Sequence, residues 1–329
     1  MKTKIAYAVT SSSDDVFWEQ FWVSAWSLKH YNPTAFVVVA TDKETYEAVC
    51  LSYRKESLSL IDRVIPIEFE KNYTKMQRSR WLKIKLHELV HDDLLYVDSD
   101  TVITADISEI DLFNFDIGFV YDMHSNPRAI PVSSSKYKYA FDCDLEENVP
   151  FYNGGLFYAK NSKQSDVFFS KWFDNWVMAD NKLGYKDQLP LVKTVADLNN
   201  PVTPISGIYN CQPLSGIKYL YSAKIVHFFN NPWLFHTQIH PLMQKETYES
   251  IKDNQRITKD FELLILNCKS EFSDISSPVG VEEAVFIRTP ITRYLYYLYK
   301  NNNHIFQKLN RFSVRMVKFF EGLHLLKKT

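Results

Sequence analysis

The sequence of 329 residues predicts an α/β fold with a mainly parallel central sheet. Apolar, β-branched runs alternate with segments of helical periodicity through the first half of the chain. Those runs are apolar on both faces, as strands are in a parallel sheet that helices cover on both sides. Hydrophobic residues make up 46% of the chain and charged residues 23%, which indicates a globular protein with a full core rather than a disordered chain.

Each element of this alternation has its own signal. The first helix ends at Asn32-Pro33, and the second places Trp81, Ile84 and Leu89 inward at helical spacing. The expected elements are a strand at 4–10, a helix at 14–33, strands at 35–42 and 63–67, a helix at 76–93, and strands at 94–97 and 117–122. From about residue 240 strand signals thin out, so we expect one domain over 1–240 and a mostly helical extension over 241–329.

The glycines exclude two classes of nucleotide-binding protein. There are eight, and the first is Gly118, so the turn after the first strand contains no G-x-G-x-x-G and no P-loop. Both motifs need backbone that approaches phosphate without an intervening Cβ. A phosphate-bearing ligand would therefore be neutralised by a metal ion or by Arg and Lys side chains.

Polar side chains follow several of the expected strands. Asp98 and Asp100 come directly after the run LLYV, Thr10 ends the first strand with Ser11 next to it, and Asp122 ends the last. Ligands of open α/β sheets bind beyond the carboxyl ends of the strands. Two adjacent carboxylates repel each other unless a cation lies between them, and oxygen ligands suit Mg²⁺ or Mn²⁺. The structural alternative is that one of the two aspartates caps a helix.

Four motifs in order resemble the family 8 glycosyltransferases. They are SRWLKIKL, LLYVDSDTVITADISEI, YNGGLFYAKNS and YKDQLPLV, and the opening run VTSSSDDVFWEQFWVSAWSLKHYNP is similar to the first strand–helix unit of bacterial members. The resemblance covers roughly residues 4–235. It implies a GT-A fold over the first domain, a nucleotide-sugar donor that is usually UDP-linked, Mn²⁺ with Mg²⁺ as the alternative ion, and retention of anomeric configuration.

The resemblance also implies roles for individual residues. The metal would be held by Asp98, Asp100 and His227, and the reacting sugar would lie beside Asp187 and Gln188. The donor would be bound by eight residues: Thr10, Ser11, Arg80, Lys83, Asp98, Ser99, Asn153 and Gly154.

Several of these positions also have a purely structural interpretation. Arg80 and Lys83 would then be solvated charges on an amphipathic helix, and Asp187 would cap the helix that begins at DQLPLV. Asn153 would belong to a turn before a strand, and His227 would be a core histidine on a strand. The pair of aspartates opposite His227 favours the functional interpretation.

One run departs from the family pattern. The family has His and Gly followed by Lys-Pro-Trp, whereas this chain reads HFFNNPW, with Asn231 where the lysine would stand. The departure supports a first alternative, a GT-A-like protein without turnover that binds glycans or a membrane. A second alternative is a metal-dependent phosphoesterase, although such sites gather more His and Asp residues than this cluster.

The C-terminal end predicts a basic amphipathic helix over about 304–328. Residues 301–329 carry six basic residues against Glu321, a net charge of +5, while the whole chain carries −1. Its apolar stripe consists of Ile305, Leu309, Phe312, Met316, Phe319, Phe320, Leu323 and Leu326. Such a helix binds an anionic bilayer surface, or it packs on its own domain or on another protomer.

The expected partners are a UDP-sugar and an acceptor that is a bacterial surface glycan or a lipid-linked sugar, with no nucleic acid. The first residues become polar too early for a signal peptide, and the four cysteines show no metal or disulfide spacing. We therefore expect a cytoplasmic protein, with a peripheral position on the inner face of the cytoplasmic membrane as the alternative that the tail raises.

Overall fold

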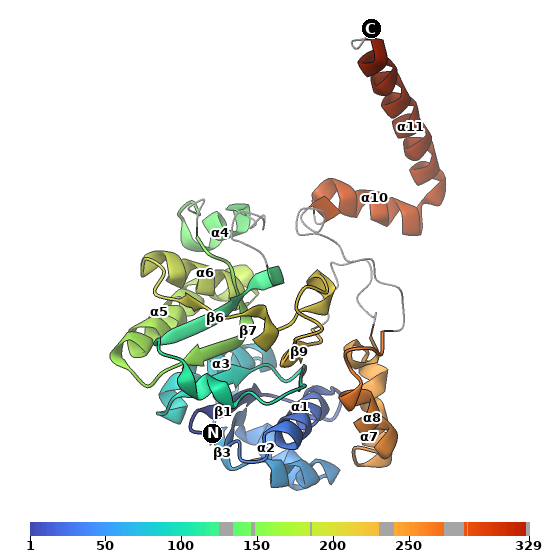
Figure 1. Cartoon of the computed structure of the whole chain (residues 1–329). Helices are drawn as coiled ribbons and strands as arrows, with labels where there is room; N and C mark the ends of the chain where they lie inside the picture. The colour runs from blue at the N-terminus through green and yellow to red at the C-terminus, as the bar shows by residue number, and fades with distance from the viewer. Residues whose placement is uncertain are drawn as a thin grey trace. The chain divides into compact units, whose positions relative to one another are not determined.

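The computed structural model describes residues 1–124, 134–145, 149–184, 186–229, 240–272, 286–287 and 289–326. Two compact units are present, Met1–Val281 and Glu282–Thr329. The first unit contains the sheet together with the helices on both of its faces (Figure 1).

The central sheet has seven strands in the described part of the chain, in the order β3-β2-β1-β4-β7-β6-β8. Its strands are β1 (Lys4–Val9), β2 (Val37–Asp42), β3 (Arg63–Ile67), β4 (Leu94–Val97), β6 (Ile117–Tyr121), β7 (Tyr152–Ala159) and β8 (Thr203–Pro204). All run in one direction except β7, which is antiparallel to both of its neighbours, β4 and β6. The carboxyl ends of β1, β4 and β6 therefore meet the amino end of β7 at one edge of the sheet.

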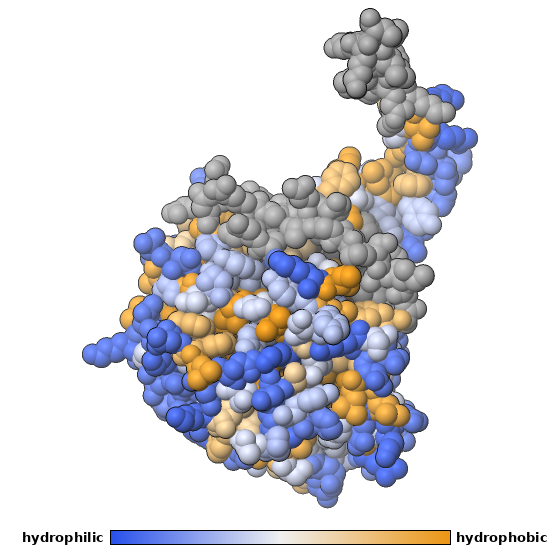
Figure 2. All heavy atoms as spheres, viewed as in Figure 1, coloured by the Kyte–Doolittle hydropathy of each residue, from blue (hydrophilic) through white to orange (hydrophobic). Residues whose placement is uncertain are grey.

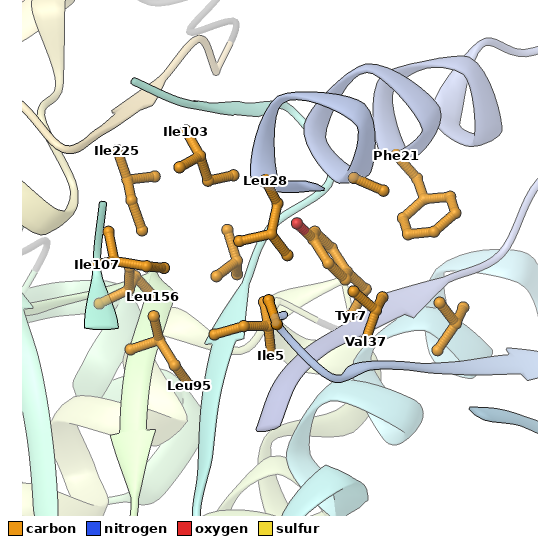
Figure 3. Close-up of a cluster of buried hydrophobic side chains, with 14 of the residues drawn as sticks. Ile5, Tyr7, Phe21, Leu28, Val37, Leu95, Ile103, Ile107, Leu156 and Ile225 are labelled. Atoms are coloured by element: carbon orange, nitrogen blue, oxygen red, sulfur yellow. The ribbon is translucent and has the colours of Figure 1, made fainter. Parts of the chain in front are cut away.

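The helices of the first unit cover both faces of this sheet. They are α1 (Phe17–Tyr31), α2 (Lys43–Cys50), α3 (Lys75–Val90), α4 (Ser134–Phe141), α5 (Lys163–Ala179), α6 (Gln188–Asp197), α7 (Lys245–Asn254) and α8 (Lys259–Leu266). Alternate strand residues serve the two faces: one face packs on α1, the other on α3, α5 and α6. Figure 3 shows the first of these cores, where Ile5, Tyr7 and Leu95 of the sheet face Phe21 and Leu28 of α1.

A small antiparallel sheet lies beside the edge where the polar side chains gather. It pairs β5 (Thr101–Ile103), which follows β4 after a tight turn, with β9 (Ile225–His227). A third apolar core joins β5 and β9 to α7 and α8. Both helices therefore belong to the compact unit that contains the sheet, although the sequence boundary at residue 240 assigns them to the extension.

The ends of α3 are set by strong local signals. Thr74 accepts from the backbone N–H of Gln77, and the Gln77 side chain accepts from the backbone N–H of Thr74, which forms a capping box. The helix ends at His91, which adopts a left-handed conformation with φ of 58°. The expected α/β class, the two helices and the five expected strands are all confirmed, with boundaries shifted by at most a few residues.

The second unit contains α10 (Pro290–Asn301) and α11 (Asn303–Leu326). On α11 the apolar stripe is exposed as far as its side chains are described: Ile305, Leu309, Phe312 and Met316 all lie on the surface. Figure 2 shows hydrophobic and hydrophilic residues side by side on the described part of this unit. None of the described helices is both long enough and apolar enough to cross a bilayer.

Candidate functional site

Acidic side chains gather at the carboxyl end of β4. Asp98 and Asp100 lie in the turn between β4 and β5, and no helix begins there for either of them to cap. The turn is anchored on both sides: the backbone N–H of Asp98 donates to the carbonyl of Gly155 at 2.9 Å, and that of Phe228 donates to the carbonyl of Asp100 at 2.8 Å. The two carboxylates are therefore held in place by backbone from β7 and from the end of β9.

His227 completes a cluster of three potential metal ligands with these aspartates. The pairing of β5 with β9 sets Thr101 opposite His227, so the imidazole reaches the turn. Its Nε2 lies 3.1 Å from Oδ1 of Asp100 and 3.9 Å from Oδ2 of Asp98. One ligand atom from each of the three residues lies within 4.8 Å of the others. Two carboxylate oxygens and one imidazole nitrogen fit Mn²⁺ or Mg²⁺.

The charges of this cluster depend on one another. Burial alone would lower the pKa of the His227 imidazole, but the Asp100 and Asp98 carboxylates outweigh it and raise that pKa above its ordinary value. Burial would likewise raise the pKa of Asp100, but the charge and the hydrogen bond of the His227 imidazole outweigh the effect of burial and lower that pKa. The cluster thus keeps negative charge that a bound cation can neutralise.

Two basic residues of α3 face the site from the other side. Nζ of Lys83 lies 3.4 Å from Oδ1 of Asp98 and 3.1 Å from Oδ2 of Asp187, while Nε of Arg80 lies 3.2 Å from Oδ1 of Asp187. Lys83 is 3% exposed, and a buried ammonium is stable only when it is paired. The interpretation of Lys83 as a solvated surface charge is therefore wrong for this fold, and Arg80, with a side chain that is 32% exposed, is paired with Asp187.

Asp187 occupies the N-cap position of α6, but its side chain makes no capping hydrogen bond. Both of its oxygens are instead paired with the cations of α3. Burial would raise the pKa of Asp187, yet Lys83 and Arg80 outweigh it and lower the value to about 2. The next residue, Gln188, donates its side-chain amide to the carbonyl oxygen of Tyr152 on β7.

Tyr96 supports Asp98 from within β4. Burial raises the pKa of its hydroxyl well above the ordinary value, so the group stays protonated and donates to Oδ1 of Asp98. The Lys83 ammonium lies over the same ring, 5.1 Å from its centroid. Because Oδ1 is engaged by Tyr96 and Lys83, Oδ2 of Asp98 remains on the side of His227.

The amino end of β7 contributes Asn153 and two glycines that differ in their surroundings. A Cβ on Gly155 would lie 2.3 Å from Cε1 of His227, so this position requires glycine. A Cβ on Gly154 would lie 3.5 Å from Oδ2 of Asp187 and from Nζ of Lys83, which is ordinary van der Waals contact. The sequence resemblance singled out Gly154, whereas the close approach of backbone to a ligand residue occurs at Gly155.

A cavity of about 420 Å³ opens beside the acidic turn. The predicted donor-binding residues Thr10, Arg80, Asp98 and Ser99 line it, together with Asp100. Eight further residues line the cavity, none of them expected there from the sequence, and among them are Phe17, Lys75 and Tyr96. Four predicted donor-binding residues and the predicted metal ligand Asp100 are therefore gathered around one cavity.

Ser11 lies elsewhere among its own partners. Its hydroxyl donates to Oδ1 of Asp15 at 2.5 Å, and its backbone N–H donates to Oγ1 of Thr45. The guanidinium of Arg54 donates to the same hydroxyl at 3.3 Å and forms an ion pair with the fully buried Glu19 at 2.7 Å. These bonds hold the loop between β1 and α1, and Ser11 is not among the residues that line the cavity.

The run HELVH on α3 has the H-E-x-x-H spacing of zinc sites, but the structure does not form one. Nε2 of His87 lies 3.1 Å from the carbonyl oxygen of Lys160, and Nδ1 lies 3.5 Å from Asp166. His91 is the exposed left-handed residue after the helix, so the two rings do not share a helical face. Within the described residues, the cluster that can hold a metal is Asp98, Asp100 and His227.

Asn231, the departure in the HFFNNPW run, lies outside the described residues. Asn210 is a residue of the site for which the sequence held no signal. It is fully buried between β7 and β9, and it bonds both Asn153 and His227.

Comparison with known proteins identifies the fold. No protein-family model matches the chain, and no curated protein matches it at a significant level. Among solved structures, the bifunctional glycosyltransferase WbbM matches with a TM-score of 0.52 and 13% identity, over 80% of this chain and 51% of that one. An active-site mutant of LgtC matches with a TM-score of 0.50 and 14% identity, over 79% of this chain and 99% of that one. A structure of the galactosyltransferase LgtC with donor and acceptor sugar analogs has a TM-score of 0.48, 16% identity and the same coverage.

At these identities the likeness concerns the fold. The chain has a GT-A-like α/β fold, and its structural matches include the family 8 glycosyltransferase LgtC. The expectation drawn from the four sequence motifs is thus confirmed at the level of fold.

Proposed function

We propose that this protein is a retaining glycosyltransferase that transfers a hexose, galactose or glucose, from a UDP-sugar to a bacterial surface glycan or a lipid-linked acceptor. The observation that carries the proposal is the cluster of Asp98, Asp100 and His227, which lies beside a cavity of about 420 Å³ at the carboxyl edge of a GT-A-like sheet. Ligand sites of α/β sheets occur at this edge.

The cavity suits a nucleotide donor in size and in charge. Its volume falls within the roughly 300–1,000 Å³ typical of small-molecule sites. Lys75 and Arg80 line it, and Lys83 lies behind Asp98, so positive charge is available for a diphosphate without a glycine-rich loop.

The residues present fit a divalent ion, which Asp98, Asp100 and His227 would hold. Bound Mn²⁺ or Mg²⁺ would neutralise charge that develops on a leaving diphosphate. The imidazole favours Mn²⁺ over Mg²⁺, because Mg²⁺ prefers a shell made of oxygen.

Retention is best explained by attack on the same face of the sugar. Both oxygens of Asp187 are paired with cations, so this carboxylate is a poor nucleophile, and the Gln188 amide is a weak one. In same-face attack the bond from the anomeric carbon to the phosphate oxygen breaks as the bond to the acceptor oxygen forms. The proton of the acceptor hydroxyl passes to the departing diphosphate. Asp187 and Gln188 together would stabilise the oxocarbenium-like charge or orient the acceptor.

We also propose that α11 brings the protein to an anionic bilayer surface, where lipid-linked acceptors are found. Lys308, Arg311 and Arg315 accompany exposed apolar residues on this helix, a combination that lies in the bilayer interface. Deleting residues 303–329 should abolish co-sedimentation with phosphatidylglycerol vesicles and leave binding to neutral vesicles unchanged. Equal sedimentation of both proteins would refute the membrane role.

The decisive experiment is calorimetry of UDP binding with and without Mn²⁺. We expect binding that depends on Mn²⁺, and we expect Asp98→Ala to weaken it by at least tenfold. Asp92→Ala is the matched control, because Asp92 precedes the opposite end of β4 and pairs only at the surface with Lys4. If UDP binds in neither condition, the GT-A-like protein without turnover becomes the better explanation. If the protein instead releases phosphate from simple esters without preference for UDP, it is a phosphoesterase.

A further inference from the structure

The metal ligand His227 makes a second contact on the side away from the aspartates. Its Nδ1 lies 3.0 Å from Oδ1 of Asn210, which is fully buried. Nδ2 of Asn210 in turn lies 2.9 Å from Oδ1 of Asn153. A chain of three polar side chains therefore leads from β7 through Asn210 to the imidazole.

Hydrogen-bond chemistry assigns every atom in this chain, starting from backbone. The N–H of Gly155 lies 2.9 Å from the Asn153 amide, and an N–H can only donate, so the Asn153 atom that it meets is the oxygen. The nitrogen of that amide then faces Oδ1 of Asp122 at 2.8 Å, and a carboxylate accepts. Both contacts agree on one orientation of Asn153, which removes the usual ambiguity of an amide flip.

The orientation of Asn153 fixes that of Asn210. Oδ1 of Asn153 is an acceptor, so the Asn210 atom beside it must be the NH₂ group. The Asn210 oxygen is thereby turned toward Nδ1 of His227. Because that oxygen only accepts, Nδ1 must carry a hydrogen. Nε2 lies 3.1 Å from a carboxylate oxygen of Asp100, so in the protonated ring it carries a hydrogen as well, and it is the nitrogen that becomes a ligand when that hydrogen is lost.

We propose that Asn210 and Asn153 are positioning residues that assign the ring hydrogen of His227 to Nδ1, so that Nε2 is presented as the metal ligand. The inference rests on the metal site of the proposed function. Outer partners of this kind hold the tautomer and the ring orientation of ligand histidines, and their loss weakens metal affinity by about 10- to 100-fold. This chain of hydrogen bonds begins at Gly155, whose backbone N–H orients Asn153 and whose lack of a Cβ leaves room for the ring of His227.

Two variants of Asn210 separate the tautomer from simple packing. Asn210→Leu keeps the branched heavy-atom skeleton and removes the acceptor, so we expect Mn²⁺ affinity to fall about 10- to 100-fold. Asn210→Asp keeps an oxygen for the Nδ1 hydrogen but loses the bond to Oδ1 of Asn153, so we expect a lower melting temperature and an Mn²⁺ affinity within severalfold of the wild type. Asn175→Leu is the matched control, because Asn175 is also fully buried but bonds Thr194 and Asp197 on another helix.

Two measurements decide the matter without reference to turnover. Electron paramagnetic resonance of free Mn²⁺ gives the affinity of each folded variant in the absence of nucleotide. Nitrogen-15 NMR of histidine-labelled, metal-free protein at alkaline pH reports which ring nitrogen of His227 carries the hydrogen, and His227→Gln assigns the signal. We expect the hydrogen on Nδ1 in the wild type and in Asn210→Asp, and a shift toward Nε2 in Asn210→Leu.

The hydrogen on Nε2 in the wild type would overturn the inference even if UDP binds as proposed. A folded Asn210→Leu protein with unchanged tautomer and unchanged Mn²⁺ affinity would also overturn it. If that variant does not fold, the wild-type tautomer and the Asn210→Asp protein still decide. A wild type with the hydrogen on Nδ1 that binds no Mn²⁺ would contradict the proposed function while leaving the hydrogen-bond chain supported.

Discussion

Replacing Gly155 with alanine should damage the candidate metal site, whereas the same change at Gly154 should not. A Cβ at position 155 would lie 2.3 Å from Cε1 and 2.8 Å from Nδ1 of His227, and 2.8 Å from Oδ1 of Asn153. At position 154 the nearest atoms lie at 3.5 Å. The two neighbouring glycines therefore provide a test and its control on one strand.

The size of the effect follows from these distances. To restore van der Waals contact, the imidazole must retreat by roughly 1 Å, while metal–ligand distances vary by only about 0.2 Å. Overpacking of this kind costs about 1–3 kcal/mol of folding free energy. For a domain of this size that corresponds to a fall in melting temperature of about 2–4 °C for each kcal/mol. We expect Mn²⁺ affinity to fall at least tenfold, because one of three ligands is displaced.

The assay is Mn²⁺ titration of Gly155→Ala and Gly154→Ala, each after a thermal melt that verifies folding. We expect weak Mn²⁺ binding for the first protein and wild-type binding for the second. A folded Gly155→Ala protein with wild-type Mn²⁺ affinity would refute it, because His227 would then not need its observed position. Equal losses in both proteins would show that β7 tolerates no added atom and that the contact with His227 is not specific.

Two further predictions concern stability. The pKa of Asp187 is about 2, below its ordinary 3.8, because Lys83 and Arg80 favour the ionised carboxylate. These ion pairs therefore contribute about 2 kcal/mol to the free energy of unfolding above roughly pH 5, and the contribution is lost as the pH falls toward 2. In urea unfolding at pH 5, Asp187→Asn should have a lower free energy of unfolding than the wild type, and this difference should shrink by about half at pH 3. A difference in unfolding free energy that does not depend on pH would contradict the ion pairs. Arg54→Met should cost about 3–5 kcal/mol, because it leaves the fully buried Glu19 without its cation. The double variant with Glu19→Met should recover part of that loss in the same assay, because it removes the buried charge but not the other bonds lost with Arg54, and no recovery would refute this explanation.

Much of the fold was predictable because its signals are local. The strand at β4 and the helix α3 were expected from apolar runs and periodicity, and α3 begins at a capping box that the sequence itself contains. β5 was not expected, since three residues carry no periodic signal. The reversed direction of β7 was also unpredictable, because nothing in its residues distinguishes a parallel from an antiparallel neighbour.

The candidate site was also predictable in part from the sequence. Asp98 and Asp100 were recognised from their position after a buried strand, and Arg80 and Lys83 from the motif on the preceding helix. The choice between a helix cap and an ion-paired Asp187 could not be made from sequence, since both are compatible with a residue that precedes a helix. Packing favours the ion-paired role of Asp187, because Lys83 is buried beside it and the charge of a buried ammonium must be balanced.

By itself, the sequence determined the α/β class, the order of the elements and the pair of aspartates at a strand end, because these depend on neighbours within a few residues. The grouping of His227 with those aspartates was expected only from the family resemblance, and the pairing of β5 with β9 brings the three together. Only the tertiary structure decided that Asn210 bonds the far side of His227 and that Gly155 makes room for its ring. Each of these contacts joins segments that are distant in the chain, and their register is set by the pairing of β5 with β9 and by the packing around them. Long-range pairing depends on which surfaces fit together, and no short stretch of sequence contains that information.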